Sequence, residues 1–182
     1  MADFLTAFKI TGINEGGYAF NHNDAGKETY CGIARKFWPN WAGWPIIDEA
    51  KTHVDNVIGL DMMLSKNSNI QSMIDNFYKQ NFWDVNKLDL INDQQLANNI
   101  YDFGVNSGTG EAAKTLQLNA GVTQDGIIGT QTLNTVNNYN AEAIYNAYNN
   151  SRKLFYIELS KKPGQLQFLN SWLSRLKPYQ TT

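Results

Sequence analysis

Apolar side chains recur at helical spacing along most of this 182-residue chain, and that spacing restricts the fold more than any other feature. In residues 69–83 they fall three or four positions apart and so share one helix face: Ile70, Met73, Ile74, Phe77 and Phe82. Similar patterns predict helices over residues 46–56, 93–105, 110–119, 130–138, 141–161 and 165–176. Strand signals are sparse. The sequence therefore predicts a mainly α fold of eight or nine helices.

The N-terminal part of the chain predicts a helix, a polar loop and a second, shorter helix. Residues 4–13 carry apolar side chains at helical spacing, with Asp3 placed to cap that helix and Gly16-Gly17 placed to end it. Residues 18–30 are polar and predict a loop or a small β-hairpin. A short helix is expected over residues 31–38.

Composition and charge exclude several classes of protein. A hydrophobic content of 42% and an aromatic content of 13% are enough for a folded core. The connections between helices are short, so we expect lobes of residues 1–90 and 91–182 to form one globular unit. We also expect this unit to be a monomer. A net charge of −2 does not indicate a nucleic-acid partner. The single cysteine, Cys31, excludes an internal disulfide, and two histidines exclude a histidine-rich metal site, so no metal or cofactor is expected.

The chain shows no targeting or membrane-spanning segment. No apolar run approaches the roughly 18 residues that cross a bilayer. The start of the chain lacks the basic residues and the apolar stretch of a secretory signal. We therefore expect synthesis in the cytoplasm, no membrane partner, and a separate route of release if the protein acts outside the cell.

Glu15 is the first candidate for catalysis. A carboxylate in the last turn of a helix faces the negative end of the helix dipole, which favours its protonated form and raises its pKa. Partial burial beside Tyr18 would raise the pKa of Glu15 further. A carboxyl group that is protonated near neutral pH can act as a general acid. The alternative is an ordinary exposed glutamate before a glycine cap.

Asp24 and Thr29 follow Glu15 in the polar loop. A second carboxylate across a cleft would complete the pair that glycoside hydrolysis uses, in which one group protonates the leaving oxygen and the other activates water or stabilises the cation. The Thr29 hydroxyl is suited to orient that water. The alternative is structural, since Asn23-Asp24-Ala25-Gly26 is also good turn chemistry and Thr29 also suits a strand or a helix cap.

Aromatic residues are dense just after this loop, and they indicate a carbohydrate ligand. Aromatic faces stack on sugar rings, while asparagine side chains meet sugar hydroxyls. Asn106, in a segment expected to be a loop, is a further candidate. The alternative is a small satellite core beneath a loop. The candidate substrate-binding residues are Tyr18, Tyr30, Trp38, Trp41, Trp44 and Asn106.

These residues resemble a known family. The stretch INEGGYAFNHNDAGKETYCGIARKFWP is similar to the start of glycoside hydrolase family 108, whose hallmark is a Glu-Gly-Gly block after the first helix. In the second half, DFGVNSG and DGIIGTQT are similar to the predicted peptidoglycan domain that accompanies this family. DGIIGTQT also has a purely structural reading, as a turn followed by a helix cap.

The resemblance implies a lysozyme-like, two-lobed fold and an N-acetylmuramidase that acts on peptidoglycan glycan strands, with Glu15 as its acid. It also implies a phage or prophage protein that reaches the wall after holin-type or other non-classical release, with an inactive cytoplasmic prophage remnant as the alternative. The spacing is similar to the Glu-x8-Asp-x5-Thr arrangement of phage-type lysozymes, but Thr29 comes one residue early, which leaves its role and the role of Asp24 open.

Three other functions stay open. A lytic transglycosylase would cleave the same bond with one glutamate and no attacking water. Some family members have been called secretion activators, so a wall-binding accessory protein without activity is a second alternative. A chitinase-like enzyme is a third, fainter one. Whether hydrolysis would retain or invert the anomeric configuration is also open, because it depends on the separation of the carboxyl groups.

Overall fold

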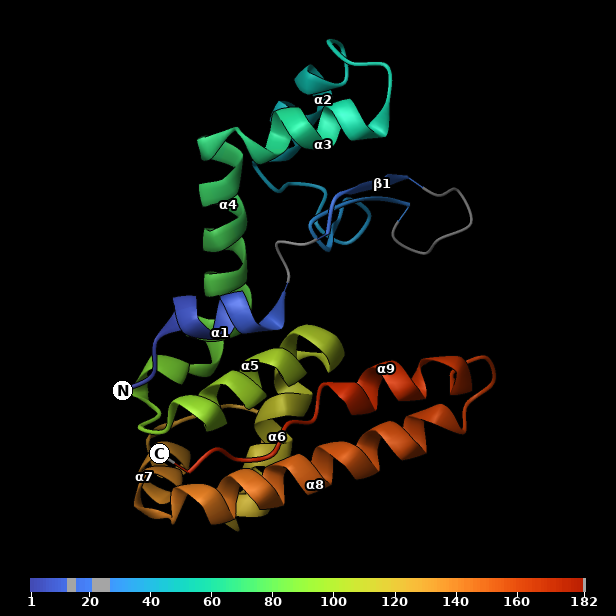
Figure 1. The fold of residues 1–182 in the computed structure, drawn as a ribbon. Coiled ribbons are helices and arrows are strands. Elements are labelled where there is room, and N and C mark those ends of the chain that lie inside the picture. Colours follow the sequence, from blue (N-terminus) through green and yellow to red (C-terminus); the bar gives the residue numbers. More distant parts are fainter. Residues whose placement is uncertain (13–15, 21–26, 182) are drawn as a thin grey trace. The chain divides into compact units, whose positions relative to one another are not determined.

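The structure is a computed structural model that describes residues 1–12, 16–20 and 27–181 (Figure 1). Glu15 and Asp24 lie outside the described residues. The described part contains nine α-helices and one small sheet, which confirms the predicted mainly α fold. It divides into two compact units: Phe8–Asn81, which we call the hairpin unit, and Met1–Ala7 with Phe82–Thr182, which we call the helical unit. Helix α1 (Phe4–Thr11) spans the boundary between them at Ala7.

Three antiparallel strands lie in the hairpin unit: β1 (Tyr18–Phe20), β2 (Glu28–Tyr30) and β3 (Ile33–Ala34). Strand β2 lies in the middle of the sheet. Tyr18 pairs with Tyr30 across β1 and β2, and Tyr30 pairs with Ile33 across β2 and β3. The small β-hairpin predicted within residues 18–30 is therefore present.

The short helix predicted over residues 31–38 is wrong. Cys31 and Gly32 both have positive φ angles, 46° and 77°, and they form a two-residue turn that sends the chain back as β3. Two positive φ angles in a two-residue hairpin loop are the signature of a type I′ turn, whose twist matches that of the strands. Tyr78 stabilises this turn, because its hydroxyl donates a hydrogen bond of 2.8 Å to the Cys31 carbonyl.

Replacing Gly32 by alanine is expected to destabilise the hairpin unit by about 1–3 kcal/mol, because alanine resists a positive φ. A Cβ at this position would also lie 2.6 Å from the Tyr78 hydroxyl oxygen. Chemical denaturation would measure the change. Gly59→Ala is the matched control, because a Cβ there meets only ordinary contacts inside a helix. Equal stability of the two variants would contradict this account of the turn.

Helix α1 begins as predicted but ends earlier. The Asp3 side chain caps it by accepting a hydrogen bond of 2.7 Å from the Thr6 backbone N–H. The helix ends at Thr11, and Gly12 follows with a φ of 67°, the left-handed conformation that commonly terminates helices. The predicted stop at Gly16-Gly17 is therefore wrong. The helix-dipole argument for a raised pKa of Glu15 also fails, because it requires that residue to stand in the last turn of this helix.

Three helices complete the hairpin unit: α2 (Trp44–Ala50), α3 (Val57–Ser65) and α4 (Ser68–Tyr78). Asparagine side chains cap two of them. Asn56 accepts from the Gly59 N–H, and Asn67 accepts from the N–H groups of Asn69 and Ile70. Helix α4 continues into the π-helical turn η2 (Lys79–Trp83).

The apolar face predicted for residues 69–83 forms much of the core of the hairpin unit. Four side chains of α4 on this face are buried: Ile70, Ile74, Phe77 and Tyr78.

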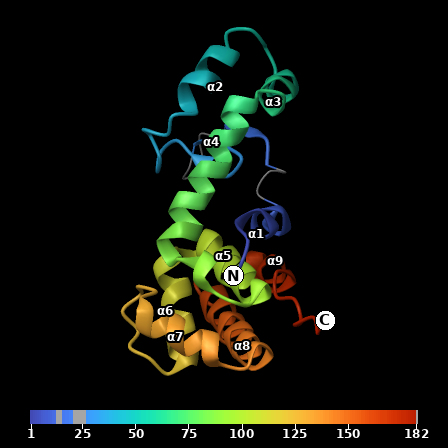
Figure 2. The same cartoon turned by 90° about the vertical axis from the view of Figure 1, so that its left-hand side faces the viewer.

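The helical unit is built around α5 (Gln94–Ser107), α6 (Thr109–Ala120) and the long α8 (Ala141–Ser160), which pack against one another. Helix α7 (Thr130–Asn138) lies beside α6 and α8 (Figure 2). The remaining elements are short: η3 (Asp84–Asn86), η4 (Leu88–Leu90), η5 (Leu166–Phe168) and α9 (Leu169–Ser174). Among the helices of the described residues, none has the length and apolarity of a membrane span.

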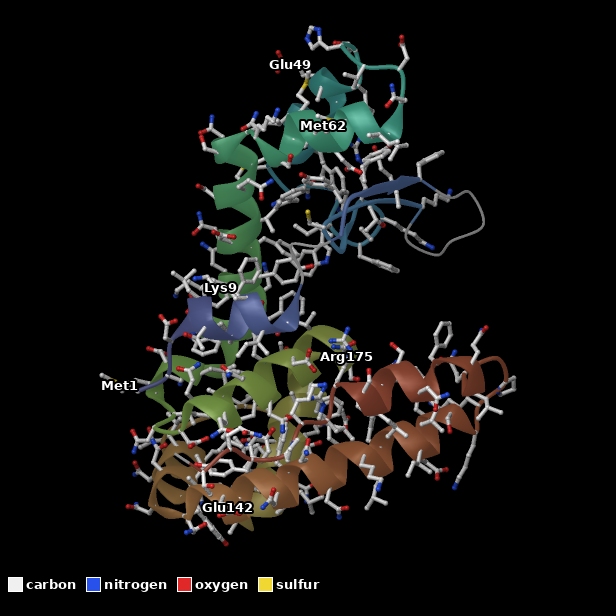
Figure 3. The ribbon with its side chains drawn as sticks, in the orientation of Figure 1. Met1, Lys9, Glu49, Met62, Glu142 and Arg175 are labelled. Atoms are coloured by element: carbon white, nitrogen blue, oxygen red, sulfur yellow. The ribbon has the colours of Figure 1, made fainter. Side chains whose placement is uncertain are left out.

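A buried ionic network joins three parts of the helical unit. Arg152 on α8 is only 1% exposed and pairs with the carboxylate of Asp102 on α5. Arg175, which is labelled in Figure 3, comes just after α9. Its guanidinium reaches the same carboxylate at 2.7 Å. Asn99 and Tyr156 accept further hydrogen bonds from the Arg152 guanidinium, at 2.6 Å and 2.8 Å. Each of the three nitrogens of this buried guanidinium therefore has a hydrogen-bond partner.

Candidate functional site

The hairpin separates the predicted site residues onto two faces. Side chains alternate along a strand, so Glu28 and Tyr30 share one face of β2 and Thr29 lies on the other. Tyr18 is opposite Tyr30, and Ala19 is opposite Thr29. The structure therefore brings Tyr18 and Tyr30 together and places Thr29 on the face away from them. Tyr30 is buried, and its hydroxyl accepts a hydrogen bond from Gln71.

A buried glutamate, Glu28, organises the face that carries Tyr18 and Tyr30. It is 8% exposed and accepts a 2.9 Å hydrogen bond from the Tyr18 hydroxyl. Lys51 pairs with Oε1 of Glu28, and Arg35 Nε lies 2.8 Å from Oε2. Burial lowers the pKa of Lys51, but its hydrogen bonds to Glu28 and Tyr18 outweigh that effect, so the pKa is raised. Glu28, on β2, therefore links to β1 through the Tyr18 hydroxyl and to the end of α2 through Lys51, and its negative charge faces two cations.

The segment just after Glu15 is anchored by Asp61 on α3. The carboxylate of Asp61 accepts a 2.6 Å hydrogen bond from the Tyr18 backbone N–H. Gly17 lies directly against the same carboxylate, because a Cβ at Gly17 would be 2.5 Å from Oδ2 of Asp61. A side chain at position 17 would push the Asp61 carboxylate aside and so disturb its hydrogen bond to Tyr18, which gives this glycine of the Glu-Gly-Gly-Tyr block a local structural explanation.

The three tryptophans after the hairpin differ in burial. Trp44 is 3% exposed, donates its indole N–H to the Trp38 carbonyl at 2.7 Å and lies beneath the Arg35 guanidinium. Trp41 is partly buried and packs edge-to-face on Trp44, with ring centroids 5.2 Å apart. Trp38 is 39% exposed. Trp44 thus holds the loop in place, and the other two rings reach the surface.

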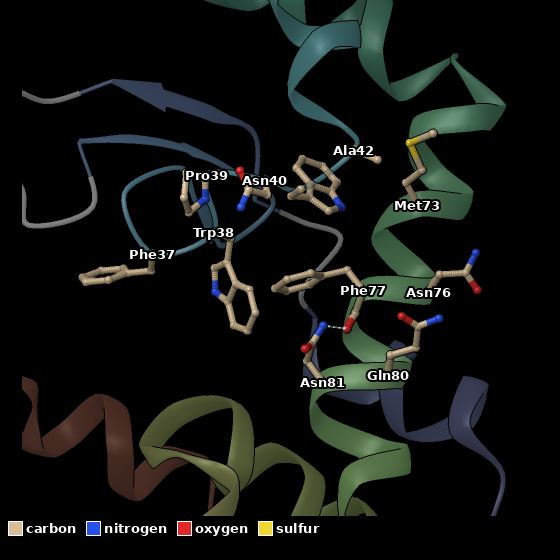
Figure 4. A pocket seen from close by; sticks show the side chains of 11 residues that line it. Phe37, Trp38, Pro39, Asn40, Ala42, Met73, Asn76, Phe77, Gln80 and Asn81 are labelled. Carbon is tan, nitrogen blue, oxygen red and sulfur yellow. Dashed lines mark hydrogen bonds between the residues drawn. The ribbon is translucent and has the colours of Figure 1, made fainter.

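Trp38 and Trp41 line a pocket of about 480 Å³ between the loop of residues 37–42 and the C-terminal half of α4 with η2 (Figure 4). Phe77 meets Trp38 edge-to-face, with ring centroids 4.8 Å apart. The pocket lies entirely within the hairpin unit. Its wall combines aromatic rings with side-chain amides: Phe37, Trp38, Pro39, Asn40, Trp41, Ala42, Met73, Asn76, Phe77, Gln80 and Asn81.

Sequence reasoning missed the α4 side of this pocket. Asn76 and Gln80 are four residues apart and so lie on one side of the helical segment, next to Phe77. These polar residues interrupt the apolar pattern of residues 69–83, and that interruption was the available signal of a polar helix face. The sequence pattern does not reveal that the tryptophan loop folds against this face.

Asn106 lies in the helical unit and is exposed on the last turn of α5, so its predicted loop placement is wrong. Its side chain donates to the Asp102 carbonyl one helical turn earlier.

The turn at Asp125-Gly126 is held from within the helical unit by the buried Gln117 on α6. The Gln117 amide nitrogen donates to Asp125 Oδ1 at 2.7 Å and to the Ile127 carbonyl at 3.0 Å. Its oxygen accepts from the Gly126 N–H at 2.9 Å. The structural role considered for DGIIGTQT therefore has a specific basis. The hydrogen bonds from the Ile127 N–H and Gln117 lower the pKa of Asp125.

Gln117→Leu is expected to destabilise the helical unit by about 1–3 kcal/mol, because the polar groups of the turn lose their buried partner. The same change should raise the pKa of Asp125 toward its ordinary value, since one of the hydrogen bonds that lower it is gone. Thermal unfolding and an NMR titration of Asp125 would measure the two effects. The exposed Gln131 offers a control as Gln131→Leu. An unchanged Asp125 pKa would contradict the role given to Gln117.

Within the described residues, no group of three or more histidine, cysteine, aspartate or glutamate side chains lies close enough together to hold a metal ion.

Comparisons with known proteins cover almost the whole chain. Residues 8–108 match the family model described as Glycosyl hydrolase 108, and residues 111–177 match the model described as Predicted Peptidoglycan domain. Among solved structures, the chain is similar to SagA of Brucella abortus, with 26% sequence identity and a TM-score of 0.67 over 95% of this chain and 88% of that chain. No curated protein sequence matches it. The shared architecture confirms the predicted lysozyme-like fold.

Proposed function

Because the chain belongs to the glycosyl hydrolase 108 family, we propose that it cleaves the β-1,4 bond between N-acetylmuramic acid and N-acetylglucosamine in peptidoglycan, with Glu15 as the general acid. The chain is a glycoside hydrolase, and its C-terminal part is a peptidoglycan domain. The proposal concerns the bond that is cleaved and the residues that cleave it.

The observation that carries the proposal is the family match over residues 8–108, which includes the Glu15-Gly16-Gly17-Tyr18 block. The backbone beside this block supports it. The hydrogen bond from the Tyr18 N–H to Asp61, and the close approach of Gly17 to the same carboxylate, tie the residues after Glu15 to α3. A general acid must be held within hydrogen-bond reach of the oxygen that it protonates.

The chemistry requires one proton and one water molecule. In the proposed reaction Glu15 donates its proton to the glycosidic oxygen as the bond to the muramic C1 breaks. Asp24 is the proposed second carboxylate, which stabilises the cation or removes a proton from the attacking water. Thr29 is the proposed water-orienting hydroxyl. In the described part of the chain the Thr29 side chain makes no hydrogen bond to the protein.

Digestion of purified peptidoglycan, followed by mass spectrometry of the soluble fragments, tests the proposed reaction. We expect fragments that end in reducing N-acetylmuramic acid. Fragments that end in anhydro-muramic acid would show that the reaction is transglycosylation and not hydrolysis. Binding to the wall without release of any fragments would show a binding protein and would contradict the catalytic roles proposed for Glu15, Asp24 and Thr29.

A further inference from the structure

The pocket around Trp38 has a chemical character that points to one part of the glycan. We propose that it binds an uncharged N-acetylglucosamine unit of the strand and does not accept N-acetylmuramic acid that carries its peptide. This inference rests on the proposed function, because it names a subsite for the same polymer. It concerns residues that lie outside the Glu15 block and are fully described.

The aromatic part of the wall is suited to a sugar ring. Trp38 keeps 39% of its surface exposed, while its edge-to-face contact with Phe77 fixes the orientation of its ring. The main chain beneath it is also fixed, because the Trp38 carbonyl accepts the indole N–H of the buried Trp44. A rigid, partly exposed aromatic side chain offers apolar contact area at a low cost in conformational entropy.

The polar part of the wall consists of amides that the protein leaves available. Within the described residues, the side chains of Asn40, Asn76 and Gln80 make no hydrogen bond to the protein, and all three are exposed. Each amide offers both donors and an acceptor, which suits sugar hydroxyls and the acetamido group alike. In Figure 4, Asn76 and Gln80 project from α4 and η2 beside Phe77, across from the loop that carries Asn40. Amides therefore lie on both sides of the aromatic rings.

The charge of the wall decides between the two sugars of the strand. None of the residues that line the pocket is charged. Lys36 lies beside it, with its ammonium 5.7 Å from the centre of the Phe37 ring, but it is not part of the lining. The muramic unit carries either a lactyl carboxylate or a peptide with carboxylates. The pocket lining offers no cation to pair with such an anion, whereas N-acetylglucosamine carries no charge and needs none.

Isothermal titration calorimetry tests this subsite. The protein used is the full chain carrying Glu15→Gln, a substitution that is expected to prevent turnover of the ligand. The probes are chitotetraose, an uncharged oligomer of N-acetylglucosamine, and the free stem peptide of peptidoglycan. We expect chitotetraose to bind and the peptide not to compete with it. Adding Trp38→Ala should raise the Kd for chitotetraose on the order of tenfold, as loss of a stacked ring does. Adding Phe168→Ala, a 46% exposed aromatic in the helical unit, should leave the Kd unchanged.

Two further variants guard against misfolding. Trp38→Phe should recover part of the affinity, and Gln80→Ala, at an exposed position, should weaken binding without affecting the fold. The inference is overturned if chitotetraose does not bind, or if its Kd is unchanged by the substitutions at Trp38 and Gln80. It is also overturned if the stem peptide binds and Trp38→Ala weakens that binding. These results are distinct from a failure of the proposed reaction, which would appear as intact peptidoglycan after treatment with wild-type protein.

Discussion

Asp102→Ala is expected to destabilise the helical unit by about 3–5 kcal/mol, the cost of leaving a buried charge without its partner. Arg152 is the reason. Burial lowers the pKa of this guanidinium, but the charge of Asp102 outweighs that effect, so the pKa is raised and the group stays charged. Without Asp102, a cation that is 1% exposed keeps only neutral partners. Chemical denaturation monitored by circular dichroism would measure the loss.

The order of related variants tests this explanation. Arg152→Met should cost less than Asp102→Ala, because Asp102 keeps its ion pair with Arg175 and is itself less deeply buried. Replacing both Asp102 and Arg152 by apolar side chains should recover part of the stability that Asp102→Ala loses. The control is Glu158→Ala, which breaks the exposed pair with Lys161 on α8 and should change stability by at most about 0.5 kcal/mol. A loss for Asp102→Ala no larger than for this control would contradict the account.

Glu15→Gln is expected to lower the rate of peptidoglycan cleavage by a factor of roughly 10²–10⁴, the range that general acid catalysis supplies. Glutamine has nearly the same shape but has no proton to give to the leaving oxygen. The rate of release of soluble fragments from purified wall measures the loss. Binding to the wall should be retained, so kcat should fall far more than KM changes.

Glu49→Gln provides the matched comparison for this substitution. Glu49 is an exposed glutamate on α2 in the same unit, and its replacement removes the same charge without touching the Glu-Gly-Gly-Tyr block. We expect activity within about twofold of the wild type, as for surface changes away from a site. Similar losses for both variants would attribute the effect to net charge and not to a missing acid.

The sequence predicts the helices well where their pattern is long. The range 141–161 becomes α8 (Ala141–Ser160), and the apolar positions of 69–83 become the buried face of α4. Turns are harder to predict because they depend on backbone angles. Cys31 at a φ of 46° is an unusual conformation for a residue with a side chain, and nothing in its local pattern predicts a strand at Ile33. Gly12 likewise ends α1 before the glycine pair that looked like the stop.

The site is less predictable than the fold because its contacts join distant parts of the chain. Glu28 falls in the stretch predicted as a loop or small hairpin, and only the folded structure brings Arg35 and Lys51 to it. Asp61 acquires its role because α3 packs beside β1. Aromatic density did lead to Trp38 and Trp41, but the amides of Asn76 and Gln80 that complete their pocket come from α4 and η2, far along the chain from the tryptophan loop.

Digestion of purified peptidoglycan in water enriched in oxygen-18 tests the central claim most directly. If the chain hydrolyses the muramic acid bond with Glu15 as the acid, wild-type protein will release fragments with the heavy oxygen at the muramic reducing end. Glu15→Gln, folded as judged by circular dichroism, will release almost none. Fragments without the label, or labelled fragments released equally fast by Glu15→Gln, would contradict the claim.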